Sequence, residues 1–302
     1  MPTDRPASVE QRIVDASYLL PAYGGITGWA ALRWLGGRWF DGHDARGSHR
    51  PVPLAITEAN LRPRPGVQIS KEQLAPRHLA VVDGLALTSA VRSACFEMRY
   101  ATDDDAAVVV LEMAAYSDLV SVAEMEDHAA TLNGWTGIPR CRRALSWAEE
   151  NSWSPQETRL RLLWRRGLED LVSSLRCNEP VFDLCGRHLG TPDLIDPHVG
   201  VVGEYDGEVH LTRESRHLDI NREAGLRAAG LEVVVMTAED HRAPEQFIAR
   251  LRAAYQRAAR TPVADRGWTL QAPPWWIPTL TVEQRRSLSA ADRQRLLGHR
   301  AS

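Results

Sequence analysis

Residues 191 to 210, TPDLIDPHVGVVGEYDGEVH, constrain the fold more than any other stretch of the chain. Two short apolar runs with carboxylates at their ends flank the turn-prone sequence PHVG. Apolar runs of this length, separated by about four turn residues, are typical of a β-hairpin made of inner strands. Pairing Asp196 with Val201 sets the register of this hairpin. Counting along the strands from that pair, away from the turn, places Asp193 opposite Glu204.

Two carboxylates placed opposite each other in a hairpin repel, and this repulsion must be offset by another group. Directly opposed residues have β-carbons about 5 Å apart, and like charges at that separation destabilise the sheet. Strand alternation places Asp206 on the same face as Glu204, and Gly207 permits a sharp turn that brings His210 back toward the acids. Because carboxylates with open positions for water and phosphate oxygens suit a hard divalent cation, the hairpin predicts a Mg²⁺ or Mn²⁺ site on Asp193 and Glu204. The alternative is a solvated hairpin whose acids face water.

Beyond about residue 152 the pattern alternates between helices and strands. The sequence SPQETRLRLLWRRGLEDLVSSLR predicts an amphipathic helix with Ser154 as N-cap, Pro155 at its first position and Glu157 closing a capping box. Strands are expected at 180 to 186, 189 to 195, 201 to 206 and 231 to 237, and helices at about 214 to 229 and 244 to 259. This order predicts an α/β domain with a central mixed sheet over residues 152 to 261.

The preceding part of the chain predicts an α+β domain over residues 1 to 151. Helical periodicity at 9 to 36 is interrupted by LPAYGGITG, and the Pro- and Gly-rich stretch 37 to 87 contains several short β-like runs. From residue 88 onward this domain is expected to be largely helical. A Pro- and Trp-rich tail follows at 262 to 302, and its tryptophans are expected to pack onto the body, with base stacking or partner docking as alternatives.

Composition narrows the class of protein. With 302 residues, 44% hydrophobic and 25% charged, the chain has the make-up of a packed soluble protein large enough for two domains. It lacks an apolar run of the ~20 residues that a membrane span needs and lacks a secretory signal, so we expect a cytoplasmic protein with no membrane partner. The four cysteines have neither CxxC nor zinc-finger spacing, which predicts reduced and mostly buried thiols. A net charge of −3 means that any nucleic-acid surface must be a local arginine patch.

The hairpin residues also resemble a known superfamily. Pro192-Asp193, ten residues, then E-x-D-G-x-x-H at 204 to 210, followed by Asp219, Arg222, Leu226, Gly230 and VVV, is similar to the PD-(D/E)xK nucleases. Within that superfamily the likeness is to the domain related to very-short-patch-repair endonucleases. The earlier sequences GWAALRWLGG, GLALTSAVRSACFEMR and SWAEENSWSPQETRLRLLW are similar to actinobacterial AbiEi-like abortive-infection antitoxins fused to such a domain. The resemblance covers about residues 15 to 260 and implies a restriction-endonuclease-like fold in the second domain.

The resemblance assigns roles to individual acids. It implies that Asp193 and Glu204 bind the metal and that Glu157 is a further catalytic acid from the first helix of that fold. Asp206, a further candidate catalytic residue, occupies the superfamily's lysine position, so the usual cation beside the attacking water is missing. His210 could supply that function as a catalytic residue.

Several of these residues have ordinary alternatives. Arg222 could replace the missing cation or contact a DNA phosphate, or it could form a helical ion pair with Asp219. Glu157 could serve only as a helix cap, and His210 could be a surface histidine after a turn. Asp196, which precedes a proline, is expected to be a turn residue rather than a ligand.

Three functions remain open at this level. The leading hypothesis is a Mg²⁺- or Mn²⁺-dependent DNA endonuclease in phage defence or repair. The second is a non-catalytic, antitoxin-like DNA-binding transcriptional regulator, favoured by Asp206 in the lysine position. However, the region before GWAALRWLGG is too short for a complete winged helix. The third is an interaction module whose first domain and tail dock a toxin or another protein.

Overall fold

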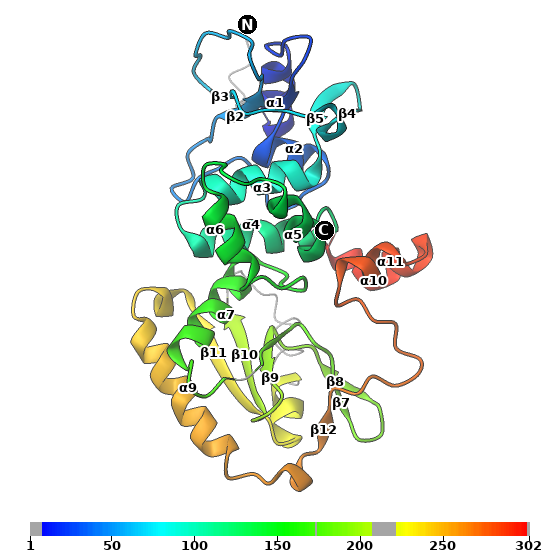
Figure 1. Ribbon diagram of the computed structural model, residues 1–302. Helices are drawn as coiled ribbons and strands as arrows, with labels where there is room; N and C mark the ends of the chain where they lie inside the picture. The colour runs from blue at the N-terminus through cyan, green and yellow to red at the C-terminus, as the bar shows by residue number, and fades with distance from the viewer. Residues whose placement is uncertain (1–7, 173, 207–221, 301–302) are drawn as a thin grey trace, which may run out of the picture. The chain divides into compact units, whose positions relative to one another are not determined.

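The computed structural model describes residues 8–172, 174–206 and 222–300. The chain divides into two compact units, the first formed by residues 1–150 with 286–302 and the second by residues 151–285 (Figure 1). Both units combine helices with strands, so the protein is of mixed α and β structure. The Pro- and Trp-rich tail is shared between the units, because the division falls within it at residue 285.

The first unit contains a five-stranded sheet of order β3-β2-β1-β5-β4. Its strands are β1 (Gly25–Ile26), β2 (Val52–Ala55), β3 (Val67–Ser70), β4 (Leu79–Val82) and β5 (Leu85–Thr88). Its helices are α1 (Val9–Ser17), α2 (Gly28–Trp34), α3 (Ala90–Tyr100), α4 (Asp104–Tyr116), α5 (Val122–Ala130), α6 (Ile138–Leu145) and α11 (Ala290–Leu297), with 3-10 turns η1 (Pro76–His78) and η4 (Gly298–Arg300). The predicted order, with a strand-rich middle followed by a helical stretch, is confirmed.

The second unit contains a four-stranded mixed sheet of order β11-β10-β9-β6. Its strands are β6 (Arg176–Cys177), β9 (Leu194–Asp196), β10 (Val201–Asp206) and β11 (Glu232–Thr237). Strand β10 runs parallel to β11 and antiparallel to β9, and β6 is antiparallel to β9. A second sheet of order β12-β7-β8 is formed by β7 (Val181–Asp183), β8 (His188–Gly190) and β12 (Trp268–Thr269). The helical elements are α7 (Pro155–Gly167), a helix at 222–228, η2 (Ala238–His241), α9 (Pro244–Ala258), η3 (Val263–Asp265) and α10 (Val282–Arg286).

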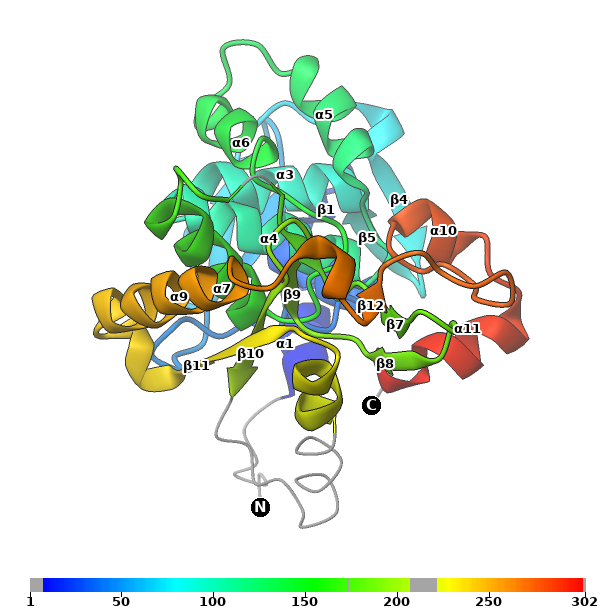
Figure 2. The same cartoon turned by 90° about the horizontal axis from the view of Figure 1, so that it is seen from below.

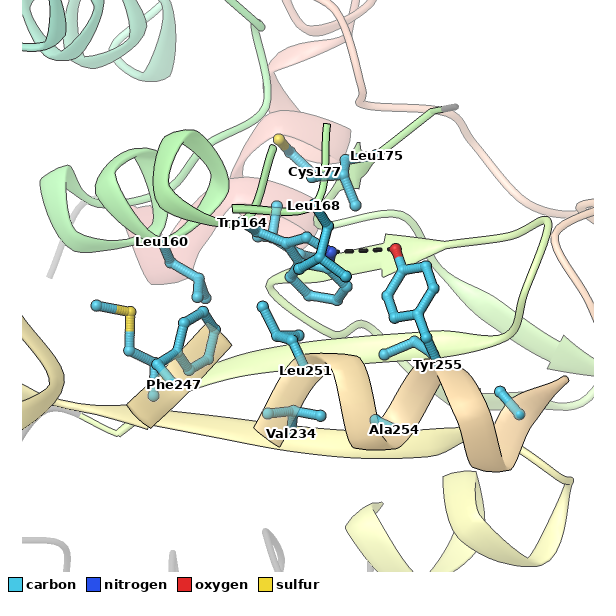
Figure 3. Close-up of a cluster of buried hydrophobic side chains, with 14 residues drawn as sticks. Leu160, Trp164, Leu168, Leu175, Cys177, Val234, Phe247, Leu251, Ala254 and Tyr255 are labelled. Carbon is cyan, nitrogen blue, oxygen red and sulfur yellow. Dashed lines mark hydrogen bonds between the residues drawn. The ribbon is translucent and has the colours of Figure 1, made fainter. Parts of the chain in front are cut away.

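The central sheet of the second unit is covered on both faces. Helices α7 and α9 lie side by side on one face, as both views show (Figures 1 and 2). Their apolar side chains, including Leu160, Trp164 and Phe247, form one core cluster with strand residues such as Val234 (Figure 3). A second cluster forms on the residues that alternate to the opposite side, among them Val202, and it includes Leu226 and Trp268. Strands covered on both faces read as apolar runs, which is why the hairpin was visible in the sequence.

The predicted hairpin is confirmed together with its register. Asp196 pairs with Val201, and the next pairs inward follow the predicted count as far as Leu194 with Gly203. Gly200 has a φ of +84°, a conformation that glycine adopts without strain. The strand expected at 189 to 195, however, is two strands in different sheets, β8 and β9. Pro192 lies between them and has no N–H to donate to a ladder, so one continuous strand there is disfavoured.

Gly203 provides the space into which α7 packs. A β-carbon built at Gly203 would lie 2.5 Å from Cζ3 of Trp164, a side chain that is fully buried. We therefore predict that Gly203→Ala lowers the free energy of unfolding by about 1–3 kcal/mol, the usual cost of overpacking a core. Urea unfolding followed by tryptophan fluorescence would measure this, with Gly225→Ala as control because a β-carbon there meets no atom. Equal effects of the two substitutions would contradict the close contact.

The thiols and tryptophans agree with expectation in most respects. Cys95, Cys141 and Cys177 are buried and Cys185 is exposed, and all four are free. In the tail, Trp268 is buried, and Trp276 packs edge-on against Phe182 with ring centroids 5.0 Å apart, whereas Trp275 is exposed. Packing onto the body is therefore confirmed for two of these three tryptophans. Within the three described ranges, every helix falls short of the length or hydrophobicity that crossing a bilayer requires.

Candidate functional site

The end of the β9–β10 hairpin holds two of the predicted acids. Asp193 directly precedes β9, and Glu204 is the residue of β10 just beyond the last paired position. The carboxylate of Asp193 crosses to β10 and accepts the backbone N–H of Tyr205 at 2.7 Å. Both acids are partly buried. The hairpin thus holds the Asp193 side chain against β10 by a hydrogen bond to the backbone beside Glu204.

Glu157 reaches the same region from the first turn of α7. Ser154 caps this helix by accepting the N–H of Glu157 at 3.2 Å, as predicted. The reciprocal contact of the predicted capping box is different, because Glu157 Oε2 accepts the N–H of Trp153 (2.7 Å), one residue before the cap. The same oxygen accepts Nδ2 of Asn178 at 2.7 Å. The carboxylate is therefore buried and tied to a second segment, so capping alone does not account for it.

Asn178 is a site residue that sequence reasoning missed. It follows β6 with a φ of +45°, a left-handed conformation that asparagine tolerates better than most residues. Its backbone N–H donates to the carbonyl oxygen of Asp193 (2.9 Å), and its amide nitrogen also donates to the carbonyl oxygen of Asn151 (2.8 Å). Asn178 therefore connects Glu157, through its side chain, to Asp193, through its backbone N–H. The sequence CNEP indicates a turn here, but no local signal shows what the amide contacts.

Burial and mutual repulsion disturb the titration of the two acids. The pKa of Glu157 is raised to about 7, first by burial and then by the negative charge of Asp193, while the hydrogen bonds from Asn178 and Trp153 oppose the shift. Burial raises the pKa of Asp193 to about 6, opposed by the Tyr205 N–H and by the charge of Arg222. Two acids whose charged forms are both disfavoured in one place are typical of functional sites, where a proton or a cation offsets the repulsion.

Arg222 places a cation beside Glu204. Its Nη2 lies 3.3 Å from Oε2 of Glu204, and it comes from the helix at 222–228. The aliphatic part of its side chain lies against Gly190, where a β-carbon would be 2.9 Å from Cγ of Arg222. The absence of a side chain at Gly190 thus allows the arginine to approach the hairpin. Arg222, which the sequence offered as a substitute cation, therefore lies beside one of the predicted acids.

The remaining predicted residues are distributed differently. Asp206 ends β10 and is exposed, paired in register with Thr237. His210 and Asp219 fall at 207–221, outside the described residues. Asp196 is fully buried, and its carboxylate accepts the N–H of His198 (3.0 Å), so its predicted turn role is confirmed. It contributes to the core as well, as described below.

The oxygen donors present here suit a hard divalent cation in type, although few converge. Across residues 8–172, 174–206 and 222–300, no group of three or more His, Cys, Asp or Glu side chains is placed to hold a metal ion. Mg²⁺ commonly uses only one or two carboxylates and keeps water or phosphate as its other ligands. Asp193 and Glu204 are donors of this chemical type. Among the described residues, the buried Oδ1 of Asn178 has no hydrogen-bond partner.

Comparison with known proteins adds no assignment: no family model matches the chain, and neither curated proteins nor solved structures give a match.

Proposed function

We propose that the second unit is a metal-dependent DNA nuclease whose site combines Glu157, Asp193 and Glu204. The observation that carries this proposal is the gathering of three acids at the end of the hairpin: Asp193 accepts the Tyr205 N–H beside Glu204, and Asn178 joins Glu157 to the segment of Asp193. Acids that repel one another in a partly desolvated place are typical of a site that a cation completes. A restriction-endonuclease-like fold is part of the proposal, and its support is the order of a helix, an antiparallel hairpin and a parallel strand.

Five residues of the second unit have a defined role in this proposal. Asp193 and Glu204 would hold Mg²⁺ or Mn²⁺, which when bound supplies a polarised phosphate and a more acidic water. Glu157, whose pKa is raised to about 7, can take up or release a proton near neutral pH. Arg222 beside Glu204 can offset charge on the phosphate, in place of the lysine that Asp206 replaces. Asn178 positions Glu157 through its amide.

The decisive experiment is a cleavage assay with plasmid, single-stranded and mismatched DNA in Mg²⁺ or Mn²⁺. We expect cleavage by the wild type and a loss of about 100-fold or more in Asp193→Ala, because even outer-shell partners of a metal are worth about 10- to 100-fold. Asp170→Ala is the matched control, since Asp170 is an exposed acid of the same unit. Failure to cut any of these DNAs, or equal cutting by Asp193→Ala, would remove the proposal.

Metal binding can be measured without relying on activity. We expect Mn²⁺ to raise the melting temperature of the wild type at pH 7.5 and to release heat in calorimetric titration, because binding to the folded state alone stabilises it. Asp193→Ala should lose most of this response, and Asp170→Ala should keep it. An unchanged Mn²⁺ response in Asp193→Ala would place the metal elsewhere.

A second candidate is a non-catalytic, antitoxin-like regulator that binds DNA or a toxin. The ion pair between Arg222 and Glu204 favours it, because a resident cation already neutralises one of the two proposed metal ligands. A footprint on the protein's own promoter that persists in Glu204→Ala, together with no cleavage, would support this function. Cleavage that requires Glu204 would exclude it.

A further inference from the structure

The first unit has a cavity of about 650 Å³, open to solvent on one side, that the proposed nuclease site does not use. Its size falls within the range of small-molecule sites. Its ionisable lining is mostly basic: Lys71, Arg77, His78, Arg92 and His128, against the single acid Glu58. Aromatic rings of Tyr23 and Trp135 complete part of the wall. A cavity of this size and charge is suited to an anion with an organic part.

Two of the lining residues, Arg92 and His128, are buried, and each has a side-chain nitrogen without a hydrogen-bond partner among the described residues. Arg92 is 2% exposed, and Nη2 donates to Glu72 at 2.8 Å, whereas Nη1 has no partner among the described residues. His128 is 8% exposed, and its Nε2 likewise has no partner in the described chain. Burying such groups without an acceptor is costly, and Glu72 is already shared with Arg99. Arg92 is therefore an incompletely paired cation in the wall of the cavity, and its charge favours an anion there.

The surroundings are electrostatically positive and locally strained. The pKa of His78 is lowered, first by burial and then by the positive charges of His128, Arg77 and Arg92. The His78 and His128 rings are in edge contact, with centroids 5.2 Å apart. Thr57, a β-branched residue in the wall, has a φ of +50°. Left-handed backbone at such a residue costs energy and is found preferentially at ligand sites.

We propose that this cavity binds a small phosphorylated molecule, with the phosphate near the exposed Lys71 and Arg77 and with the buried charge of Arg92 adding to the attraction. Phosphate fits better than a single carboxylate because its three oxygens can accept from several converging donors. The remaining volume, beside Tyr23 and Trp135, accommodates an organic group of about nucleotide size. This site lies wholly within the first unit and stands independently of the nuclease proposal.

The test is calorimetric titration of the full chain with adenosine 5′-monophosphate, ribose 5-phosphate, inorganic phosphate, adenosine and a 5′-phosphorylated oligonucleotide. We expect the small phosphorylated compounds to bind and adenosine not to bind. The double variant Lys71→Ala/Arg77→Ala should weaken binding roughly tenfold or more, because the loss of even one of the two charge-assisted contacts has an effect of about this size. Both side chains are exposed, so the fold should persist.

A matched control removes the same kind of charge outside the cavity. Arg62→Ala/Arg64→Ala replaces two exposed arginines of the same unit that do not line the cavity, and it should bind as the wild type does. Failure of all the small phosphorylated compounds to bind would overturn the proposal, as would equal weakening by both double variants. Binding of the oligonucleotide alone would also overturn it, in favour of a nucleic-acid contact. Comparing adenosine monophosphate with ribose 5-phosphate shows whether the base contributes.

Discussion

Replacing Glu157 by glutamine is expected to make the metal-free protein more stable at pH 8, by on the order of 3 kcal/mol, and to leave its stability near pH 4 unchanged. The reason is the raised pKa of Glu157, which is about 7 in the folded protein against an ordinary value of 4.5. The folded state therefore holds a proton that the unfolded state has already released. Its stability is full below about pH 4.5 and declines as the pH rises toward 7.

Glutamine keeps the geometry while removing the titration. Its amide oxygen can still accept the N–H of Trp153 and Nδ2 of Asn178, but it carries no charge at any pH. Urea unfolding between pH 4 and 8 in the presence of EDTA would measure the difference from the wild type. Glu169→Gln, at an exposed position of the same unit, should show no such trend. A difference between Glu157→Gln and wild type that did not vary with pH would contradict the raised pKa of Glu157.

Tyr255→Phe is expected to lower the free energy of unfolding by about 2–4 kcal/mol. The hydroxyl of Tyr255 accepts the indole N–H of Trp164 at 3.1 Å (Figure 3). It also donates to Oδ2 of the fully buried Asp196 at 2.7 Å. The nearby carboxylate and burial together raise the pKa of Tyr255, so the hydroxyl keeps its proton. Removing it leaves a buried carboxylate short of one donor and a buried indole without an acceptor.

A double-mutant cycle separates this contact from the loss of packing. In an Asp196→Asn background the same Tyr255→Phe change should cost clearly less, because no charge is then left without its donor. Tyr18→Phe removes a hydroxyl from an exposed ring of the other unit and should cost almost nothing. Urea unfolding gives all the values. A cost for Tyr255→Phe within about 0.5 kcal/mol of the Tyr18→Phe value would mean that water replaces the hydroxyl.

Local chemistry made much of the second unit predictable. The turn PHVG between two apolar runs determined the hairpin register, because one slipped residue would turn every buried side chain to the other face. Ser154 and Pro155 marked the start of α7, and Gly230, with a φ of +92°, marked the end of the helix at 222–228. The single strand expected at 189 to 195 was wrong because Pro192, which has no N–H to donate, interrupts the ladder despite the apolar residues around it.

What the sequence determined by itself was therefore the hairpin, its register and the helix ends, since these depend on neighbours a few positions away. Only the tertiary structure brought Glu157 and Asn178 to Asp193 and set Arg222 on Glu204. It also gathered the basic wall of the cavity in the first unit. The reason is that desolvation and Coulomb repulsion act through space between segments that are distant in the chain, whereas periodicity and turn chemistry record only what is local.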